Sequence, residues 1–260
     1  MKISKKWLSE YIAPLKSNDA LEHNLTQLGL EVDTITKNKD DYIIDIEFTP
    51  NRGDCLSIYG TARDLAAYKK KDVKKPTSSK FIFTKTNERI TNINPSISPE
   101  YRYMELQNIN VKTKTPKFIT ERLKQCDIAS INIIVDISNY VMLEIGQPTH
   151  AFDLDKINGK LSIAKLEKKN KFTGIDNKDY IVEKGTEVIV DERNIIHALP
   201  GVIGSKISSV NTATKNILFE SAFFLPDVVR ALSKKFRIQT ESSYRFERGV
   251  DYNLIEFTLS

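Results

Sequence analysis

Residues 217–225 constrain the fold more than any other part of this sequence. They read ILFESAFFL, a nearly continuous apolar run of the kind found in strands buried on both faces. Glu220 stands in the middle of this run, where a carboxylate costs several kcal/mol unless it is paired or hydrogen-bonded. We therefore expect Glu220 either to pair with Arg230 or Arg245, or to be held for a ligand that carries a hydroxyl, amine or cation.

The overall composition is that of an ordinary globular protein. The chain has 260 residues, of which 40% are hydrophobic and 28% charged, enough for one large domain or two modest ones. No run approaches the roughly 20 apolar residues that cross a bilayer, and the amino terminus lacks the pattern of a signal peptide. We expect no membrane association and a cytoplasmic location. The formal net charge of +5 permits contact with nucleic acid without demonstrating it.

Histidines and cysteines do not indicate a metal site. The three histidines have no zinc-like spacing to either cysteine, and no CxxC pair occurs. Cys55 and Cys126 are 71 positions apart, and we expect two buried thiols rather than a disulfide.

A basic stretch divides the chain into two parts. Residues 69–80, KKKDVKKPTSSK, predict a linker at residues 76–90. Before it, helical spacing and one alternating strand predict a small domain over residues 1–75, with a polar connection at residues 33–41. After it, we expect strands near residues 101–111, 161–166, 180–191, 194–199 and 215–222, and helices that open at Pro116, end near Gly146 and start at Pro226.

His150 and two glycines are further candidate binding residues. His150 follows the helix that ends at Gly146, in a segment dense in hydrogen-bonding side chains. It is either a binding group in a loop or a structural histidine that packs on Phe152 and bonds a nearby carbonyl. Gly201 and Gly204 either let backbone N–H groups approach a ligand or form a tight turn. The chain has no GxSxG, P-loop, GxGxxG or HExxH motif, so hydrolysis by a positioned water is the most natural reaction if it is an enzyme.

Six segments, taken together, carry a family resemblance. They are MKISKKWLSEYI, LTQLGLEVD, FTPNRGDCLSIYGTARDLAAY, VDISNYVMLEIGQPTHAFDLD, NILFESAFF and TESSYRFERGVD. In this order they resemble the amino-terminal part of the phenylalanyl-tRNA synthetase β subunit of the bacterial type. The resemblance implies an α+β fold, with a small N-terminal α+β domain followed by a larger mixed α/β editing domain over residues 91–251. Such a domain hydrolyses tyrosine that is wrongly attached to tRNA(Phe).

The resemblance also implies roles for eight residues. Four match residues around the scissile ester and the terminal adenosine: Ser138, Asn139, His150 and Thr240. Four match the tyrosine-binding pocket: Gly201, Gly204, Glu220 and Ser242. Among these, Glu220 matches the glutamate that binds the tyrosine hydroxyl. In that family the water is held by substrate and backbone groups, without a side-chain nucleophile.

Several departures from the family pattern accompany the resemblance. Ser242 stands where alanine is usual, Ser205 where a second glycine is common, and Ser138 where threonine is common. The family's inserted oligonucleotide-binding barrel is expected to be absent near residues 33–41. Residues 252–260 are expected to begin a truncated helix, and the parts that the family places beyond it are not in this sequence.

The resemblance finally implies an activity and partners. We expect part of a phenylalanine–tRNA ligase β subunit that hydrolyses mischarged tyrosyl-tRNA(Phe), binds tRNA and does not aminoacylate by itself. The expected partners are tRNA(Phe) and the α subunit, in a heterotetramer of two α and two β subunits. No cofactor or metal is expected in this chain, whereas the complete enzyme uses ATP and Mg²⁺. Two alternatives remain open: a noncatalytic structural or RNA-binding module, and a freestanding aminoacyl-tRNA deacylase.

Overall fold

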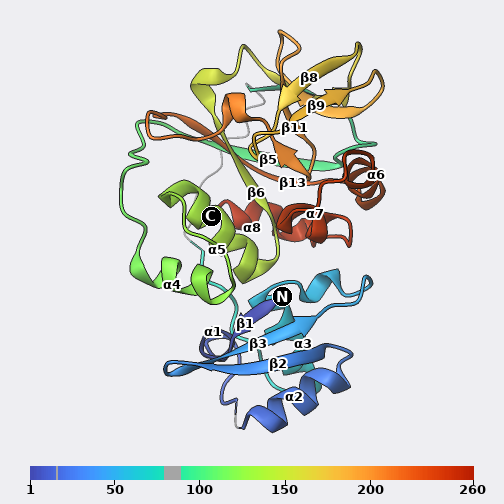
Figure 1. The fold of residues 1–260 in the computed structure, drawn as a ribbon. Helices are drawn as coiled ribbons and strands as arrows, with labels where there is room; N and C mark the ends of the chain where they lie inside the picture. Colours follow the sequence, from blue (N-terminus) through green and yellow to red (C-terminus); the bar gives the residue numbers. More distant parts are fainter. Residues whose placement is uncertain (16, 79–88) are drawn as a thin grey trace. The chain divides into compact units, whose positions relative to one another are not determined.

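The computed structural model describes residues 1–15, 17–78 and 89–260, which form two compact units. The first unit contains Met1–Ser79 and Lys114–Gln147, and the second contains Lys80–Thr113 and Pro148–Ser260. Both combine helices with sheets whose strands pair antiparallel, apart from the parallel pair β4 and β7 in the second unit (Figure 1), which confirms the predicted α+β class. The predicted linker at residues 76–90 lies largely outside the described residues.

The first unit is built on a three-stranded antiparallel sheet with the order β1-β3-β2. Its elements are β1 (Lys2–Ser4), α1 (Lys5–Ser9), α2 (Asn18–Gln27), β2 (Glu31–Asn38), β3 (Asp41–Glu47), η1 (Gly53–Cys55), α3 (Ile58–Tyr68), α4 (Lys117–Gln125) and α5 (Ile133–Ile145). Serine side chains cap three of the helices: Ser4 accepts from the Trp7 N–H, Ser17 from the Ala20 N–H and Ser57 from the Gly60 N–H.

The polar connection predicted at residues 33–41 is wrong, because β2 runs through most of it and pairs with β3. β2 is an edge strand whose side chains are mostly exposed. An edge strand that faces solvent needs no apolar alternation, so its polarity did not distinguish it from a loop.

Helices α4 and α5 belong to the first unit, although the sequence predicts a second domain that runs unbroken over residues 91–251. Tyr140 of α5 stacks on Trp7 with 4.9 Å between ring centroids. Arg122 of α4 lies 4.7 Å from the Trp7 ring, and the Tyr11 hydroxyl donates to Glu144 of α5 at 2.5 Å. These aromatic contacts join segments more than a hundred residues apart, which a reading along the chain cannot detect.

The second unit contains a five-stranded sheet in the order β12-β11-β10-β7-β4, a three-stranded sheet β5-β13-β6 and the ribbon β8-β9. Its elements are β4 (Ile90–Ile93), β5 (Glu100–Leu106), β6 (Thr149–Asp153), η2 (Leu154–Lys156), β7 (Leu161–Lys165), β8 (Asn170–Thr173), β9 (Asp179–Val182), β10 (Glu187–Val190), β11 (Ile196–Leu199), β12 (Ile203–Gly204), η3 (Lys206–Ser208), β13 (Ile217–Phe223), α6 (Pro226–Phe236), α7 (Glu241–Phe246), η4 (Tyr252–Leu254) and α8 (Ile255–Thr258).

The strand predicted from the apolar run is confirmed as β13, the centre of its sheet. It pairs antiparallel with β5 on one edge and with β6 on the other (Figure 1). The first six of its seven residues are buried. Burial on both faces and hydrogen bonding on both edges explain why the run carries almost no polar residue.

Two other predictions in this unit differ from the structure, and one helix was not predicted. The strand expected over residues 101–111 ends at Leu106, and the one expected over residues 180–191 is divided into β9 and β10. The division falls at Gly185, whose φ of 84° interrupts the extended backbone. Helix α7 was not expected, because its sequence is dense in charged and hydroxyl side chains.

Both cysteines are free; Cys55 is buried as predicted, whereas Cys126 is only half-buried. No helix within the described ranges is both long and apolar enough to cross a membrane.

Candidate functional site

A cavity of about 120 Å³ in the second unit gathers most of the residues that the sequence singled out. Six of them line it: His150, Gly201, Gly204, Glu220, Thr240 and Ser242. The remaining lining is mainly apolar and includes Ala198, Ile203, Phe224 and Phe246. The cavity is much smaller than the roughly 300–1,000 Å³ of drug-sized ligand sites, so its interior suits a group of side-chain size.

His150 and Glu220 are direct neighbours across the sheet. They are register partners in the antiparallel pair of β6 and β13, and side chains of such a pair extend from the same face. The second partner of Glu220, on β5, is Tyr103. His150 was expected in a loop, but it lies on a strand, whose edge pairing fixes its position opposite Glu220.

Glu220 is almost completely buried, and its Oε2 accepts a hydrogen bond of 2.5 Å from the Tyr101 hydroxyl. Burial raises the pKa of Glu220 to about 7, and the bond from Tyr101 opposes this rise. Of the two alternatives that the sequence left open for Glu220, the pairing with Arg230 or Arg245 is wrong. Arg230 donates to the Glu247 carbonyl and Arg245 to Glu241, and within the described residues Oε1 of Glu220 has no donor.

His150 has features of both interpretations that the sequence allowed, a structural histidine and a binding group. Its ring packs edge-on against Phe152 with centroids 4.4 Å apart, as a structural histidine would. Its Nε2, however, is buried and has no hydrogen-bond partner within the described part of the chain. Burial, together with the nearby His197, lowers the pKa of His150 to about 4, so the imidazole is neutral at pH 7. A buried polar atom without a protein partner at a cavity wall is an expected site for a ligand hydrogen bond.

A second histidine near His150 was not singled out from the sequence. His197 on β11 is fully buried, with its Nε2 3.2 Å from Oδ2 of Asp191. Burial lowers the pKa of His197, and the neighbouring carboxylate opposes that change. Its ring is edge-on to Phe152 with 6.4 Å between centroids, and Phe152 in turn packs against His150. We therefore assign His197 to the support of the cavity.

The hairpin between β11 and β12 forms another wall of the cavity. Glycine is needed at two of its positions, for a different structural reason at each. The Val202 N–H donates to the Leu199 carbonyl at 3.0 Å and closes a turn in which Gly201 has a φ of 68°, as a Pro-Gly turn requires. At Gly204 the reason is space: a Cβ there would lie 2.4 Å from Cε1 of His150. The glycines therefore make a turn and also admit the histidine ring.

Thr240 caps α7, and its hydroxyl is used within the protein. It accepts from the Ser243 N–H and donates to the Val202 carbonyl, both at 3.0 Å. The cap thus fixes the start of α7 to the hairpin that holds Gly201, and Ser242, two residues after the cap, lies in the cavity wall. Ser205, the second departure, has an ordinary backbone and lines a different cavity.

Ser138 and Asn139 are not among the residues that the second unit gathers around the cavity. Both lie on α5, in the first unit. Two features hold that helix in place: Asn132 caps it through bonds to the Ile134 and Val135 N–H groups, and Gly146, with φ 87°, ends it.

Tyr101, the hydrogen-bond partner of Glu220 in the candidate site, was not singled out from the sequence. It lies in the predicted strand at residues 101–111, and alternation alone places it on the same face as Tyr103. Only the register of β5 against β13 places its hydroxyl beside Glu220. Register between distant strands is not encoded by local pattern.

Removing the Tyr101 hydroxyl is expected to raise the pKa of Glu220 above about 7, because the bond that Tyr101 donates favours the ionised carboxylate. The carboxyl carbon resonance of Glu220, followed by NMR across a pH titration, measures this in Tyr101→Phe. Tyr103→Phe is the matched control, because the Tyr103 hydroxyl accepts from the Arg89 N–H. An unchanged midpoint in Tyr101→Phe would contradict the assignment of this bond.

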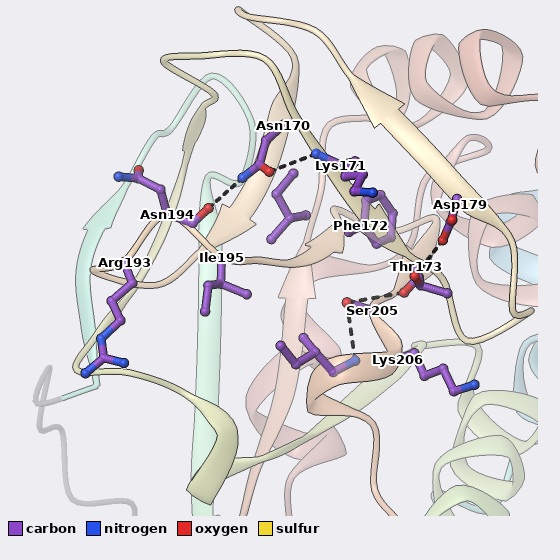
Figure 2. A pocket seen from close by; sticks show the side chains of 12 residues that line it. Asn170, Lys171, Phe172, Thr173, Asp179, Arg193, Asn194, Ile195, Ser205 and Lys206 are labelled. Atoms are coloured by element: carbon purple, nitrogen blue, oxygen red, sulfur yellow. Dashed lines mark hydrogen bonds between the residues drawn. The ribbon is translucent and has the colours of Figure 1, made fainter.

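A larger cavity of about 650 Å³ lies elsewhere in the second unit and contains none of the predicted site residues. Figure 2 shows it between the strand with Asn170 to Thr173, the loop with Arg193 and Asn194, and the segment with Ser205 and Lys206. Its lining mixes polar with apolar side chains and carries three cationic ones.

Comparisons with known proteins agree on one family. Residues 97–260 match the B3/4 domain. The phenylalanine–tRNA ligase beta subunit of Vibrio cholerae is 40% identical over 216 residues, which are 83% of this chain and 27% of that protein. That of Aquifex aeolicus is 44% identical over 214 residues, or 82% of this chain and 27% of that protein. The chain thus spans about a quarter of the length of these relatives.

A solved structure is more distantly similar. It is an N-terminal fragment of the phenylalanyl-tRNA synthetase beta subunit from Pyrococcus horikoshii, with 17% identity and a TM-score of 0.46. The match covers 90% of this chain and 73% of that one. A likeness at this level supports no statement about the site.

Proposed function

The chain belongs to the B3/4 domain family and to the amino-terminal part of bacterial phenylalanine–tRNA ligase β subunits, and from this premise we propose that it hydrolyses tyrosine wrongly attached to tRNA(Phe). The observation that carries the proposal is the pairing of Glu220 and His150 across β13 and β6 at the wall of a side-chain-sized cavity.

Selection of tyrosine follows from the environment of Glu220. An aminoacylation site built for an apolar ring rejects an added hydroxyl only weakly. Correction of misattached tyrosine therefore needs a second site that binds the hydroxyl itself. Oε2 of Glu220 is already occupied by Tyr101. We propose that Oε1 accepts the phenol hydroxyl of the misattached tyrosine. Phenylalanine would cover this acceptor without offering it a donor, which costs binding energy.

His150 is proposed to act next to the ester. Because its pKa is about 4, it is neutral at pH 7 and cannot serve as a general acid there. A neutral imidazole with a free, buried Nε2 is suited to hydrogen-bond the substrate or the attacking water. Thr240 supports the reaction indirectly, because its hydroxyl holds the hairpin with Gly201 against α7. Ser138 and Asn139 keep the roles near the ester and the terminal adenosine that the family resemblance implies.

The remaining family properties are proposals for the complete protein. We propose that it binds tRNA(Phe), assembles with an α subunit into a heterotetramer of two α and two β subunits, and operates in the cytoplasm. ATP and Mg²⁺ would serve the aminoacylation site of that assembly, and we assign no residue of this chain to them. This chain alone is proposed not to charge tRNA. The subdivision into residues 1–75 and an editing domain at 91–251, and the absence of the family's inserted barrel near residues 33–41, are likewise proposals.

Hydrolysis of tRNA(Phe) charged with radiolabelled tyrosine tests the function directly. We expect the chain to release tyrosine at least about 10-fold faster than it releases phenylalanine from the same tRNA. We expect His150→Ala to slow the release of tyrosine at least about 10-fold as well. The assay is run on the chain alone and on its complex with an α subunit. If neither preparation hydrolyses tyrosyl-tRNA(Phe) above the buffer rate, the noncatalytic alternative holds instead.

A further inference from the structure

The larger cavity of about 650 Å³ combines cationic, amide, hydroxyl and apolar side chains in its lining. We call it the cationic groove, and its lining comprises Asn170, Lys171, Phe172, Thr173, Asp179, Arg193, Asn194, Ile195, Ile196, Ser205, Lys206 and Ile207. None of these residues takes part in the hydrolytic site proposed above.

The charges of the groove favour an anionic ligand. Lys171, Arg193 and Lys206 are exposed on its rim, with Arg193 and Lys206 on opposite sides in Figure 2. The lining carboxylate, Asp179, accepts from the Thr173 hydroxyl at 2.6 Å. Neither the Lys171 ammonium nor the Arg193 guanidinium has a side-chain partner in the ranges that the structure describes. Two cations are therefore available to phosphate groups.

The floor of the groove is apolar and suits the face of a base. Phe172 and Ile196 are buried beneath it, whereas Ile207 is 50% exposed at its edge. Asn170 donates to the Asn194 carbonyl at 2.9 Å and thereby fixes one side of the floor. Apolar contact below and cations at the rim are the combination that holds single-stranded nucleic acid without base pairing.

The groove shares a wall with the hydrolytic cavity. Gly204 lines the cavity and the next residue, Ser205, lines the groove. The ribbon β8-β9 borders the groove along β8, and Ile175 near its tip lines the cavity, with its N–H donating to the Gly204 carbonyl at 3.0 Å. Strand β12 and this ribbon thus separate two neighbouring depressions of one unit.

We propose that the cationic groove binds the single-stranded nucleotides that precede the terminal adenosine of the RNA whose aminoacyl group occupies the cavity. This inference rests on the proposed function, because it takes the cavity to hold an esterified 3′ end. The phosphates contact Lys171 and Arg193, and a base covers the apolar floor beside Ile207. The groove thereby determines how strongly the 3′ end is held, without taking part in ester cleavage.

Binding of two RNA hairpins, labelled with fluorescein at the 5′ end, tests the groove. One hairpin carries a four-nucleotide 3′ overhang and the other is blunt. We expect Lys171→Glu/Arg193→Glu to bind the overhang hairpin at least about 10-fold more weakly than the wild type, with the blunt hairpin unchanged. Loss of about two phosphate contacts should also reduce the slope of log affinity against log salt by about 1.4.

Lys184→Glu/Lys215→Glu is the matched control, because it makes the same change of charge at two exposed lysines of the second unit outside the groove lining. Thermal unfolding shows whether either variant has lost its fold, and Lys171→Ala/Arg193→Ala replaces the charge reversal if it has. Equal affinity in the groove and control variants, or no preference of the wild type for the overhang, would overturn the proposal.

The kinetics of tyrosyl-tRNA(Phe) hydrolysis separate this inference from the proposed function. We expect the groove variant to raise KM about 10-fold and leave kcat unchanged. Hydrolysis with an unchanged KM would exclude the groove while the proposed function stands. Binding of the overhang that depends on the groove, without hydrolysis by the wild type, would exclude the proposed function and leave the groove as an RNA-binding site.

Discussion

Replacement of Glu220 by glutamine is expected to reduce the preference for tyrosyl-tRNA(Phe) over phenylalanyl-tRNA(Phe) by roughly 10- to 100-fold, the range for a buried hydrogen bond to a charged group. The carboxylate is buried, one of its oxygens is held by Tyr101, and its other oxygen has no donor in the described residues. The ratio of the two hydrolysis rates is the measurement, because effects common to both substrates cancel. An unchanged ratio in Glu220→Gln and Glu220→Ala would leave Glu220 with a structural role only.

The pH dependence of that ratio provides a second test of Glu220. With a pKa of about 7, the wild-type carboxylate becomes ionised between pH 6 and 8, so we expect the preference for tyrosine to rise over this range. The groups that face Glu220 from neighbouring strands are Tyr101, Tyr103 and His150. His150, with a pKa of about 4, stays neutral throughout, and burial raises the pKa of Tyr101 well above its usual value. The ratio in Glu220→Gln should therefore be flat.

Stability tests the burial of Glu220 independently of any reaction. Its pKa is raised from 4.5 to about 7 in the folded chain, which corresponds to roughly 3 kcal/mol. A carboxyl group with a raised pKa contributes full stability below about pH 4.5 and loses it as the pH rises through 7. The free energy of unfolding in urea should thus increase for Glu220→Gln relative to the wild type between pH 5 and 8. If the free energies of unfolding of the two proteins change in parallel with pH, the folded protein does not bury an ionisable carboxyl group here.

The contrast between Glu220 and Tyr101 indicates what the sequence was able to predict. A carboxylate within an apolar run is visible without any structure, because burial and charge conflict at one position. Its partner is not visible, because Tyr101 is 119 positions away and only strand register connects the two. The sequence left two possibilities open, an arginine partner or a ligand, since a buried carboxylate needs a partner, whereas the fold provides a tyrosine hydroxyl.

The same reasoning explains which elements of the fold were predicted wrongly from the sequence. Buried elements with strong apolar patterns, such as β13 and α5, were predicted well. The edge strand β2 and the short helix α7 were missed because their side chains are mostly polar. Helix α7 depends on a reciprocal cap between Thr240 and Ser243, a signal of two residues that is easily overlooked. Helices α4 and α5 joined the first unit through ring contacts with Trp7, which no local pattern encodes.

Substitution of Gly204 by alanine is expected to abolish most hydrolysis, at least about 100-fold, while the protein remains folded. An added Cβ would lie 2.4 Å from Cε1 and 2.8 Å from Nε2 of His150. The ring has little room to yield, because Phe152 packs against it at 4.4 Å. Overpacking of this kind costs about 1–3 kcal/mol, and here the strain falls on the side chain that we place next to the ester. The rate of tyrosine release and the urea midpoint are the two measurements.

A double-mutant cycle distinguishes this local clash from general destabilisation. Gly249→Ala is the control, because its φ of 88° strains an alanine although no atom lies within 4 Å of the added Cβ; it should lower stability and leave hydrolysis nearly unchanged. His150→Ala removes the ring that Gly204→Ala meets, so the double variant should regain stability relative to Gly204→Ala and hydrolyse no more slowly than His150→Ala alone. Independent, additive effects of the two substitutions would show that Gly204 does not make space for His150. Additivity would then remove the steric reason for a glycine at this position and leave only the approach of its backbone to the ligand.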